Sequence, residues 1–150
     1  MGVDTQMTDP ILFYSSRDNG YGWLSNFWSA KQEDDNFVYP TNEHYYQSQK
    51  ASDELFREWI AYSPTPYLAM VAGRAILKRD MVDNWDSKKG EIMLVGLRMK
   101  FTQNDELKKK LLATGDAELH EDSPSDKYWG MKGQDMLGKL LMKVREELRQ

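Results

Sequence analysis

Hydrophobic and polar residues follow one another with the spacing of strands in some segments and of helices in others. Short apolar runs predict three strands, at residues 11–14, 37–39 and 116–121. We expect the first two to pair as a hairpin-like ladder, with a polar turn at residues 31–36 before the second. In the third, Ala117 and Leu119 should face inward.

Longer stretches have apolar positions at helical spacing. They predict a helix at residues 42–50 capped by Thr41 or Asn42, a second helix capped by Ser52, and a third capped by Thr65 with Pro66 as its first residue. A long helix is expected at about residues 86–101. It is followed by a helix at residues 105–113, capped by Asn104 and closed by Gly115, and by a C-terminal helix capped by Asp135. Core positions are expected at Leu55, Phe56, Trp59 and Ile60 of the second helix and along the stripe Leu137, Leu140, Leu141, Val144 and Leu148. Several helices with few short strands predict an α+β, predominantly helical single domain.

Composition limits the class of protein. A chain of 150 residues with 40% hydrophobic and 29% charged residues fits one globular domain, which we place at residues 11–150 after a mobile leader at 1–10. No apolar run approaches ~18 residues, so no membrane span is expected. The absence of cysteine and the wide separation of two histidines argue against a metal site, and a cytoplasmic location fits. The net charge of −4 disfavours a non-specific nucleic-acid coat but leaves a local basic pocket open.

The helix after Pro40 carries an unusual mixture of side chains. Steps of four and three residues place Glu43, Gln47 and Lys50 on one face, with Tyr46 beside it. A packed core would not need a carboxylate, an amide, an amine and a ring together. Helix-end charges are also common without any function, since Glu43 suits the helix dipole and Lys50 suits solvent. The other segments must decide between these interpretations.

Polar groups also sit among large apolar residues in three further segments. Asn26 lies between Trp23 and Trp28, where it could line a site or satisfy its own backbone in a turn. Trp85 stands at a helix start, where it could be a core staple or a ligand platform. The aperiodic loop at residues 122–130 crowds Asp126 together with Tyr128 and Trp129.

Carboxylates and aromatic rings together suit cleavage of a glycosidic bond. One carboxylate can stabilise an oxocarbenium-like transition state or activate water, while another group helps the leaving base depart. Aromatic rings can stack on a flat base, and Arg or Lys can hold a phosphate. The same residues would also suit a binding module for nucleotides. A plain helical interaction domain would leave the polar–aromatic loops unexplained.

The sequence resembles the YbiA-like family, also called NADAR domains, from residue 13 to about residue 148. The matching pieces are Phe13-Tyr14, Leu24-Ser-Asn-Phe27, Asn42-Glu-His-Tyr-Tyr-Gln-Ser-Gln-Lys50, Gly73-Arg74, Asn84-Trp-Asp86, Met93, Lys100-Phe101, Leu112-Ala-Thr-Gly115, Leu119, Glu121, Asp126-Lys-Tyr-Trp-Gly130, Leu137-Gly138 and Leu141-Met142. They occur in the family's order, and the Glu-His-Tyr-x-Gln-x-x-Lys and Asp-x-x-Trp-Gly pieces are quite specific together.

This resemblance implies an N-glycosidase without a metal or organic cofactor. Some family members cleave the base–ribose bond of early riboflavin-pathway intermediates, and others remove ADP-ribose from guanine in nucleic acid. The expected partner is therefore a phosphoribosylated or ADP-ribosylated small molecule, with nucleic acid only as an ADP-ribosylated substrate. By position, the catalytic residues would be Glu43, Lys50 and Asp126, and the substrate-binding residues Asn26, Phe27, Tyr46, Trp85, Trp129 and Gly130. Lys50 would attack the carbon of a ring-opened ribose.

The chain departs from the family pattern after Trp129-Gly130. The segment at residues 131–138 is short, and Asp135 stands where the family usually has Asn. The loop at residues 17–23 also differs in length and composition. These changes leave a non-catalytic sensor of ADP-ribose or nucleotides as an alternative to the enzyme.

Overall fold

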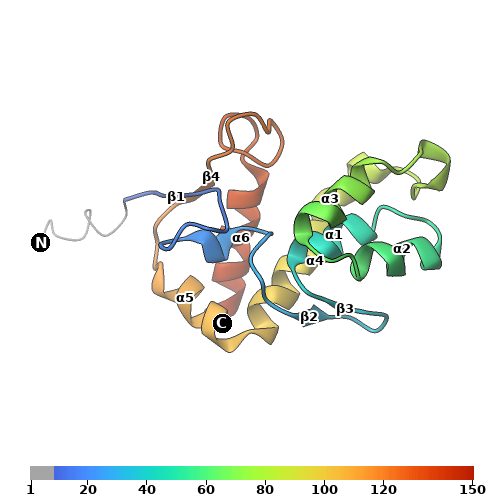
Figure 1. The fold of residues 1–150 in the computed structure, drawn as a ribbon. Coiled ribbons are helices and arrows are strands. Elements are labelled where there is room, and N and C mark those ends of the chain that lie inside the picture. Colours follow the sequence, from blue (N-terminus) through green and yellow to red (C-terminus); the bar gives the residue numbers. More distant parts are fainter. Residues whose placement is uncertain (1–8) are drawn as a thin grey trace, which may run out of the picture. The chain divides into compact units, whose positions relative to one another are not determined.

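A computed structural model describes residues 9–150 of the chain (Figure 1). Within them lie six α-helices and four short strands, which confirms the predicted α+β, predominantly helical fold. The strands are β1 (Ile11–Phe13), β2 (Gln32–Glu33), β3 (Val38–Tyr39) and β4 (Leu119–Glu121). The helices are α1 (Asn42–Ser48), α2 (Glu54–Ala61), α3 (Pro66–Arg74), α4 (Trp85–Gln103), α5 (Asp105–Ala113) and α6 (Met136–Leu148), with 3-10 turns η2 (Gly22–Leu24) and η3 (Lys78–Asp80).

Backbone contacts divide the described chain into two compact units. One contains residues 26–104, and the other contains residues 9–25 together with 105–150. The predicted leader falls mostly on residues 1–8, outside the described residues, so the proposed boundary after residue 10 stays a prediction. No helix within residues 9–150 is both long enough and apolar enough to cross a membrane.

Helix α1 is the centre of the 26–104 unit. It packs against α2, α3 and α4, and all seven of its residues are buried. Thr41 caps it as expected, because its side chain accepts a hydrogen bond from the backbone of His44. The helix ends at Ser48, so Lys50 lies in the turn that follows rather than on the helix itself. A charged and polar helix buried on every side needs internal partners for its side chains.

The predicted pairing of the first two strands is wrong. β3 instead pairs antiparallel with β2, inside the segment that we expected to be only a polar turn. Asp34 makes this hairpin, because its Oδ1 atom accepts hydrogen bonds from the backbone N–H groups of Asn36 and Phe37. β1 pairs in parallel with β4 from the far end of the chain.

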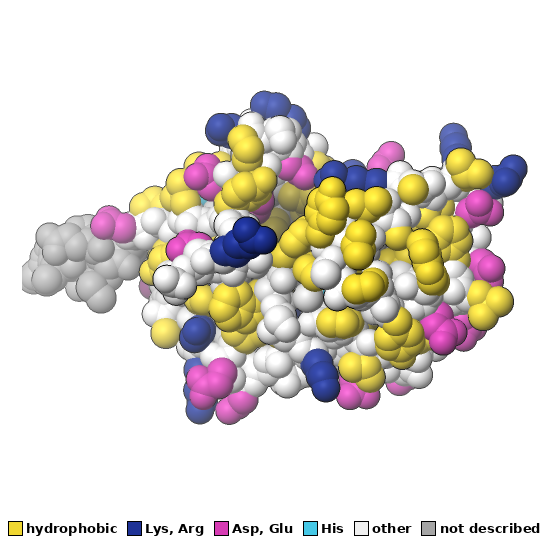
Figure 2. Space-filling model, in the orientation of Figure 1, with side chains coloured by type: hydrophobic (Ala, Val, Ile, Leu, Met, Phe, Trp, Pro, Cys, Tyr) yellow, Lys and Arg dark blue, Asp and Glu magenta, His cyan; other side chains and the backbone are white. Residues whose placement is uncertain are grey.

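Helix α2 differs from prediction at its start and on its outer face. Asp53 caps it in place of Ser52, through a hydrogen bond from the backbone of Leu55. Ile60 is buried with Ala51, but Leu55 and Trp59 are 74% and 66% exposed, so their predicted burial is wrong. Figure 2 shows hydrophobic side chains, in yellow, on the surface of the part that carries α2 and α3. Periodicity identified an apolar face, but no element of this unit covers it.

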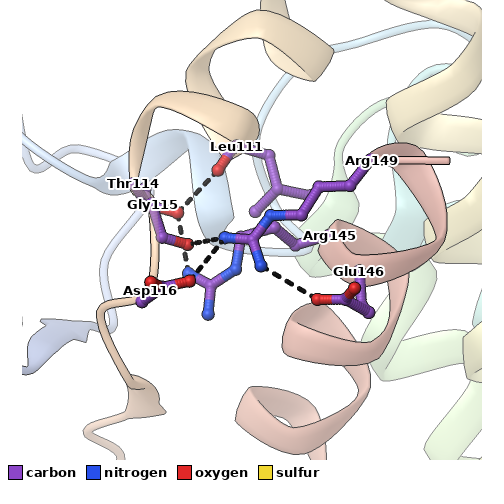
Figure 3. Close-up of polar contacts among 7 residues, drawn as sticks. All are labelled: Leu111, Thr114, Gly115, Asp116, Arg145, Glu146 and Arg149. Carbon is purple, nitrogen blue, oxygen red and sulfur yellow. Dashed lines mark hydrogen bonds and ion pairs between the residues drawn. The ribbon is translucent and has the colours of Figure 1, made fainter.

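In the second unit, α6 packs against β4 and α5, and β4 pairs with β1 (Figure 1). The predicted inward positions Ala117 and Leu119 are 3% and 0% exposed. Gly115 has the left-handed φ of 63° that ends α5. Figure 3 shows how side chains from the last turns of α6 bind the segment that follows α5. Arg145 donates to Thr114 Oγ1 at 2.8 Å, and Arg149 binds the carbonyl of Gly115 and the carboxylate of Asp116.

Two expected caps act differently. The side chain of Asn104 donates to the carbonyl of Lys100, so it closes the end of α4 instead of capping α5. Asp135 occupies the N-cap position of α6 with φ 55°, but its side chain makes no capping hydrogen bond. Its Oδ2 atom lies 2.6 Å from His120 Nδ1, and this contact to β4 takes the place of the cap.

Candidate functional site

The carboxylate of Glu43 is fixed within the first turn of α1. Glu43 is 7% exposed, and its backbone N–H donates to the carbonyl of Asn26 at 3.0 Å. The side chain of Gln47, one turn later, donates from Nε2 to Glu43 Oε2 at 2.7 Å. Four-residue spacing on a helix brings these two side chains together, as the sequence predicted. A buried carboxylate of fixed orientation suits charge stabilisation better than a mobile surface group.

Asn26 joins the loop before β2 to the start of α1. Its Oδ1 atom accepts from Asn42 Nδ2 at 2.9 Å, and its Nδ2 atom donates to the sulfur of Met93 at 3.6 Å. The alternative in which Asn26 satisfies its own backbone is therefore not what the fold contains. Phe27, the next residue, is half-buried. Asn26 contributes a backbone carbonyl and a side chain to the surroundings of Glu43, and a role of either residue in binding stays a prediction.

Lys50 lies close to two neighbouring aromatic rings, those of Tyr46 and Trp85. Its Nζ atom is 5.8 Å from the ring centre of Tyr46 and 5.8 Å from that of Trp85. The two rings are 5.2 Å apart and tilted by 56°. The backbone of Lys50 is also fixed, because its carbonyl accepts from Val82 N at 2.8 Å. The structure thus brings four predicted site residues of this unit together: Glu43, Tyr46, Lys50 and Trp85.

Burial is the main reason that the pKa of Lys50 is lowered from its ordinary value. The negative charge of Glu43 acts in the opposite direction. The positive charges of Arg74 and Lys89 lower the pKa of Lys50 further. A lowered pKa gives a lysine more of the neutral amine that can attack carbon. Lys50 is half-buried, so it keeps some access to solvent.

A second lysine in this unit has a lowered pKa but a different setting. Burial lowers the pKa of Lys100, on α4, to about 7. Its side chain lies near the ring of Phe101 and has no exposed surface. Because a nucleophile must be reached by its substrate, Lys50 is the better candidate of the two.

The predicted residues Asp126, Trp129 and Gly130 belong to the other unit, where they form a tight loop after β4. Asp126 Oδ1 accepts hydrogen bonds from the backbone of Tyr128 at 2.9 Å and of Trp129 at 2.7 Å. A Cβ atom at Gly130 would lie 2.6 Å from the Asp126 carbonyl, so this position requires glycine. Asp126 therefore shapes the loop, and its catalytic role stays a prediction.

Glu121 is a candidate in this loop that the sequence reasoning did not single out for a role. Its Oε1 atom accepts from the backbone of Ser123 at 3.1 Å. Burial raises the pKa of Glu121 to about 7, and the nearby carboxylates of Asp126, Asp122 and Asp135 raise it further against the opposing effect of the Ser123 hydrogen bond. A carboxyl group that keeps its proton near neutral pH can act as an acid. Its signals in the sequence were its place at the end of a predicted strand, beside an acidic loop, and its match to the family pattern.

Arg74 and Lys89 were also missed as neighbours of Lys50. Arg74 is the last residue of α3, and Lys89 follows Trp85 by one turn of α4. Lys89 is paired with the exposed Asp86 at 3.4 Å. Two further cations around Lys50 suit an anionic substrate group such as a phosphate. The helical spacing of Lys89 from Trp85 was a usable signal in the sequence.

No group of three or more histidine, aspartate or glutamate side chains that could hold a metal ion lies within the described part of the chain.

A NADAR domain model matches residues 12–149. N-glycosidase YbiA of Escherichia coli K12 is 42% identical over 146 residues, covering 95% of this chain and 91% of the relative. Riboflavin biosynthesis protein VVA0006 of Vibrio vulnificus is 37% identical over 148 residues, covering 96% of this chain and 40% of the relative. The NMR structure of E. coli YbiA matches with a TM-score of 0.84 over 95% of this chain and 86% of that one.

Proposed function

Because the chain belongs to the NADAR domain family, as its sequence motifs predicted, we propose that it hydrolyses the base–ribose bond of a phosphoribosylamino-pyrimidine. Its relatives in E. coli and other organisms are named N-glycosidases, so the chain is a hydrolase of N-glycosyl bonds. The V. vulnificus relative, named for riboflavin biosynthesis, supports an early riboflavin-pathway intermediate as the substrate. A cytoplasmic location, where such a metabolite would be met, stays a prediction from composition.

The observation that carries this proposal is the joint placement of Glu43 and Lys50 on either side of Gln47. Glu43 is a buried carboxylate with a fixed orientation. Lys50 is an amine of lowered pKa beside two aromatic rings. A carboxylate that can stabilise positive charge and an amine that can attack a sugar carbon, placed beside aromatic rings, suit cleavage at a sugar–base bond.

In the proposed reaction, the neutral amine of Lys50 attacks C1 of the ring-opened ribose. In the ring-opened sugar C1 is doubly bonded to the base nitrogen. That nitrogen takes both protons of the attacking amine, its bond to C1 breaks so that the base leaves as an amine, and a lysine–sugar imine forms. Water then hydrolyses this imine, which returns free Lys50 and ribose 5-phosphate. Glu43 stabilises the positive charge that develops at C1 and directs the water. Tyr46 and Trp85 border the amine, and Arg74 and Lys89 attract the phosphate.

ADP-ribosylated guanine is the second candidate substrate. It presents the same kind of bond between a base nitrogen and ribose, and its diphosphate would also suit Arg74 and Lys89. A non-catalytic sensor is the third candidate, which the Asp135 substitution motivates.

A substrate panel tests the proposal. The protein is incubated in parallel with phosphoribosylamino-pyrimidine and with an ADP-ribosylated guanine oligonucleotide, and products are followed by mass spectrometry. Ribose 5-phosphate from the first substrate alone supports the proposed function. Release of ADP-ribose from the second alone would replace it with de-ADP-ribosylation. Binding of ADP-ribose in calorimetry with no product from either would favour the sensor.

A further inference from the structure

Gln47 is a buried amide whose orientation is set by Glu43. The side chain is 4% exposed and donates from Nε2 to Glu43 Oε2 at 2.7 Å. An ionised carboxylate can only accept hydrogen bonds, so the amide must turn its nitrogen toward Glu43 and its oxygen away. The Oε1 atom of Gln47 has no hydrogen-bond partner among the described residues.

The amide of Gln47 is held from the other side by Gly73 of α3. A Cβ atom at position 73 would lie 2.0 Å from Gln47 Oε1 and 2.8 Å from Gln47 Cδ. Any side chain at residue 73 would therefore occupy the place of the amide. α1 and α3 pack closely at this point because one of them has no side chain there.

A buried acceptor without a partner costs stability, and packing alone would be served by an apolar side chain of the same length. Gln47 thus places an unpaired oxygen in the helix interface and gains one short hydrogen bond to Glu43. Local rules of stable packing are commonly broken at functional sites. The hydrogen bond to Glu43 is the benefit that can account for this arrangement.

We propose that Gln47 is a positioning residue, which the backbone of Gly73 keeps in place so that Glu43 is held in one orientation for catalysis. This inference rests on the proposed function, in which Glu43 acts on the substrate. A carboxylate that is free to rotate would spend less time in the productive geometry, and small displacements of catalytic groups lower rates strongly.

The first test replaces Gln47 by Met, which keeps the length and removes the amide. We expect kcat on phosphoribosylamino-pyrimidine to fall about 10- to 100-fold while KM changes little. The melting temperature should change little, because removal of the unpaired oxygen offsets the lost hydrogen bond to the buried Glu43 carboxylate. A lower melting temperature with unchanged kcat would show a merely structural role and overturn the inference.

The second test uses Gly73→Ala, alone and combined with Gln47→Ala. Alone, Gly73→Ala should lower kcat, because the new methyl group displaces the amide. In the Gln47→Ala background the contacts with Oε1 and Cδ are gone and only the Cβ atom of residue 47 remains, at 3.0 Å, so Gly73→Ala should cause a much smaller further fall in kcat than it causes alone. Additive losses would mean that Gly73 does not act through Gln47.

The third test, Gln47→Glu, changes the pH dependence. Two adjacent carboxyl groups cannot both ionise at low cost, so the acid limb of the kcat profile should move to higher pH. An unchanged profile would contradict a direct contact between residues 43 and 47 in the active protein.

Glu43→Gln separates this inference from the proposed function. If the wild-type protein releases ribose 5-phosphate, Glu43→Gln does not, and Gln47→Met keeps full kcat, then only the positioning role fails. If Glu43→Gln is as active as the wild type, the proposed function of Glu43 fails, and the inference fails with it.

Discussion

The Nζ atom of Lys50 lies 5.8 Å from the centre of the Trp85 ring. An ammonium group over an aromatic face is attracted to it, so this contact favours the charged form of the lysine. The pKa of Lys50 is lowered nevertheless, because burial outweighs the favourable charge of Glu43. A lysine whose neutral form is accessible beside an aromatic wall is consistent with attack on a sugar carbon.

Covalent trapping tests the role of Lys50. Borohydride added during turnover of phosphoribosylamino-pyrimidine should leave a sugar adduct on Lys50, which peptide mass spectrometry can locate. Lys50→Arg keeps the positive charge but cannot form an imine, so it should show no adduct and at least 100-fold lower kcat. Lys78→Arg, on the exposed η3 turn, is the matched control and should be trapped like the wild type. Repeated failure to trap the wild type would point to direct attack by water.

The positive charge of Lys89 should affect the pH at which the enzyme becomes active. Lys89 lowers the pKa of Lys50, so Lys89→Gln should let that pKa rise toward its ordinary value. If the neutral amine is the nucleophile, the rising limb of the plot of kcat against pH should shift to higher pH by about half a pH unit. Lys88→Gln, an exposed neighbour on α4, should leave the limb in place. An identical shift in both variants would show a general charge effect.

Glu121 should make stability depend on pH in the second unit. Its pKa is raised from 4.5 to about 7 in the folded state, with burial as the main cause. As pH rises from 4.5 to 7, the unfolded carboxyl group ionises while the folded one stays protonated, so the wild type loses stability in this window. Glu121→Gln removes this loss and should be more stable at pH 8 by about 1–2 kcal/mol, with solvent screening allowed for.

Urea unfolding at pH 4.5, 6 and 8 measures this difference. The advantage of Glu121→Gln should be near zero at pH 4.5 and largest at pH 8. Glu106→Gln, an exposed carboxylate on α5 of the same unit, is the control and should show no such trend. A constant difference between Glu121→Gln and the wild type would refute the raised pKa.

The contact between His120 and Asp135 should also make stability depend on pH, with stability lost as pH rises through a higher range. Burial lowers the pKa of His120, but its hydrogen bonds to Asp135 and Glu118 outweigh this effect, and the net pKa is raised. Stability from this cluster is therefore fully present below the ordinary pKa of about 6.5 and lost as pH rises through the folded value. Asp135→Asn tolerates the same left-handed backbone, so the comparison isolates the charge.

Thermal unfolding of Asp135→Asn and of the wild type tests this trend. The variant should be less stable by on the order of 1 kcal/mol at pH 5.5, and the difference should shrink by pH 9. A difference that stays the same at both pH values would mean that His120 is not charged by this contact.

Local signals in the sequence predicted much of the helical fold. Thr41 and the Thr65-Pro66 pair mark helix starts through hydrogen bonds and backbone geometry that involve only near neighbours. The parallel pairing of Ile11 with Leu119 joins opposite ends of the chain, and no local pattern specifies it. Likewise, periodicity places Trp59 on an apolar face but does not say whether another element covers that face.

In the candidate site too, contacts within one helix could be predicted from the sequence, whereas contacts between helices could not. The contact of Glu43 with Gln47 follows from helical spacing within α1. The contact of Gln47 with Gly73 depends on how two helices pack, so the sequence alone could not show it. The same holds for Arg74 and Lys89, which approach Lys50 from two different helices.

The central claim is that Glu43 acts in cleavage of a base–ribose bond, and one product assay tests it most directly. The wild type, Glu43→Gln and Glu54→Gln are incubated with phosphoribosylamino-pyrimidine, and ribose 5-phosphate is measured by mass spectrometry. Glu54 is an exposed carboxylate that, like Glu43, lies in the first turn of its helix. We predict product from the wild type and Glu54→Gln and none from a folded Glu43→Gln. Equal product from all three proteins would contradict the account.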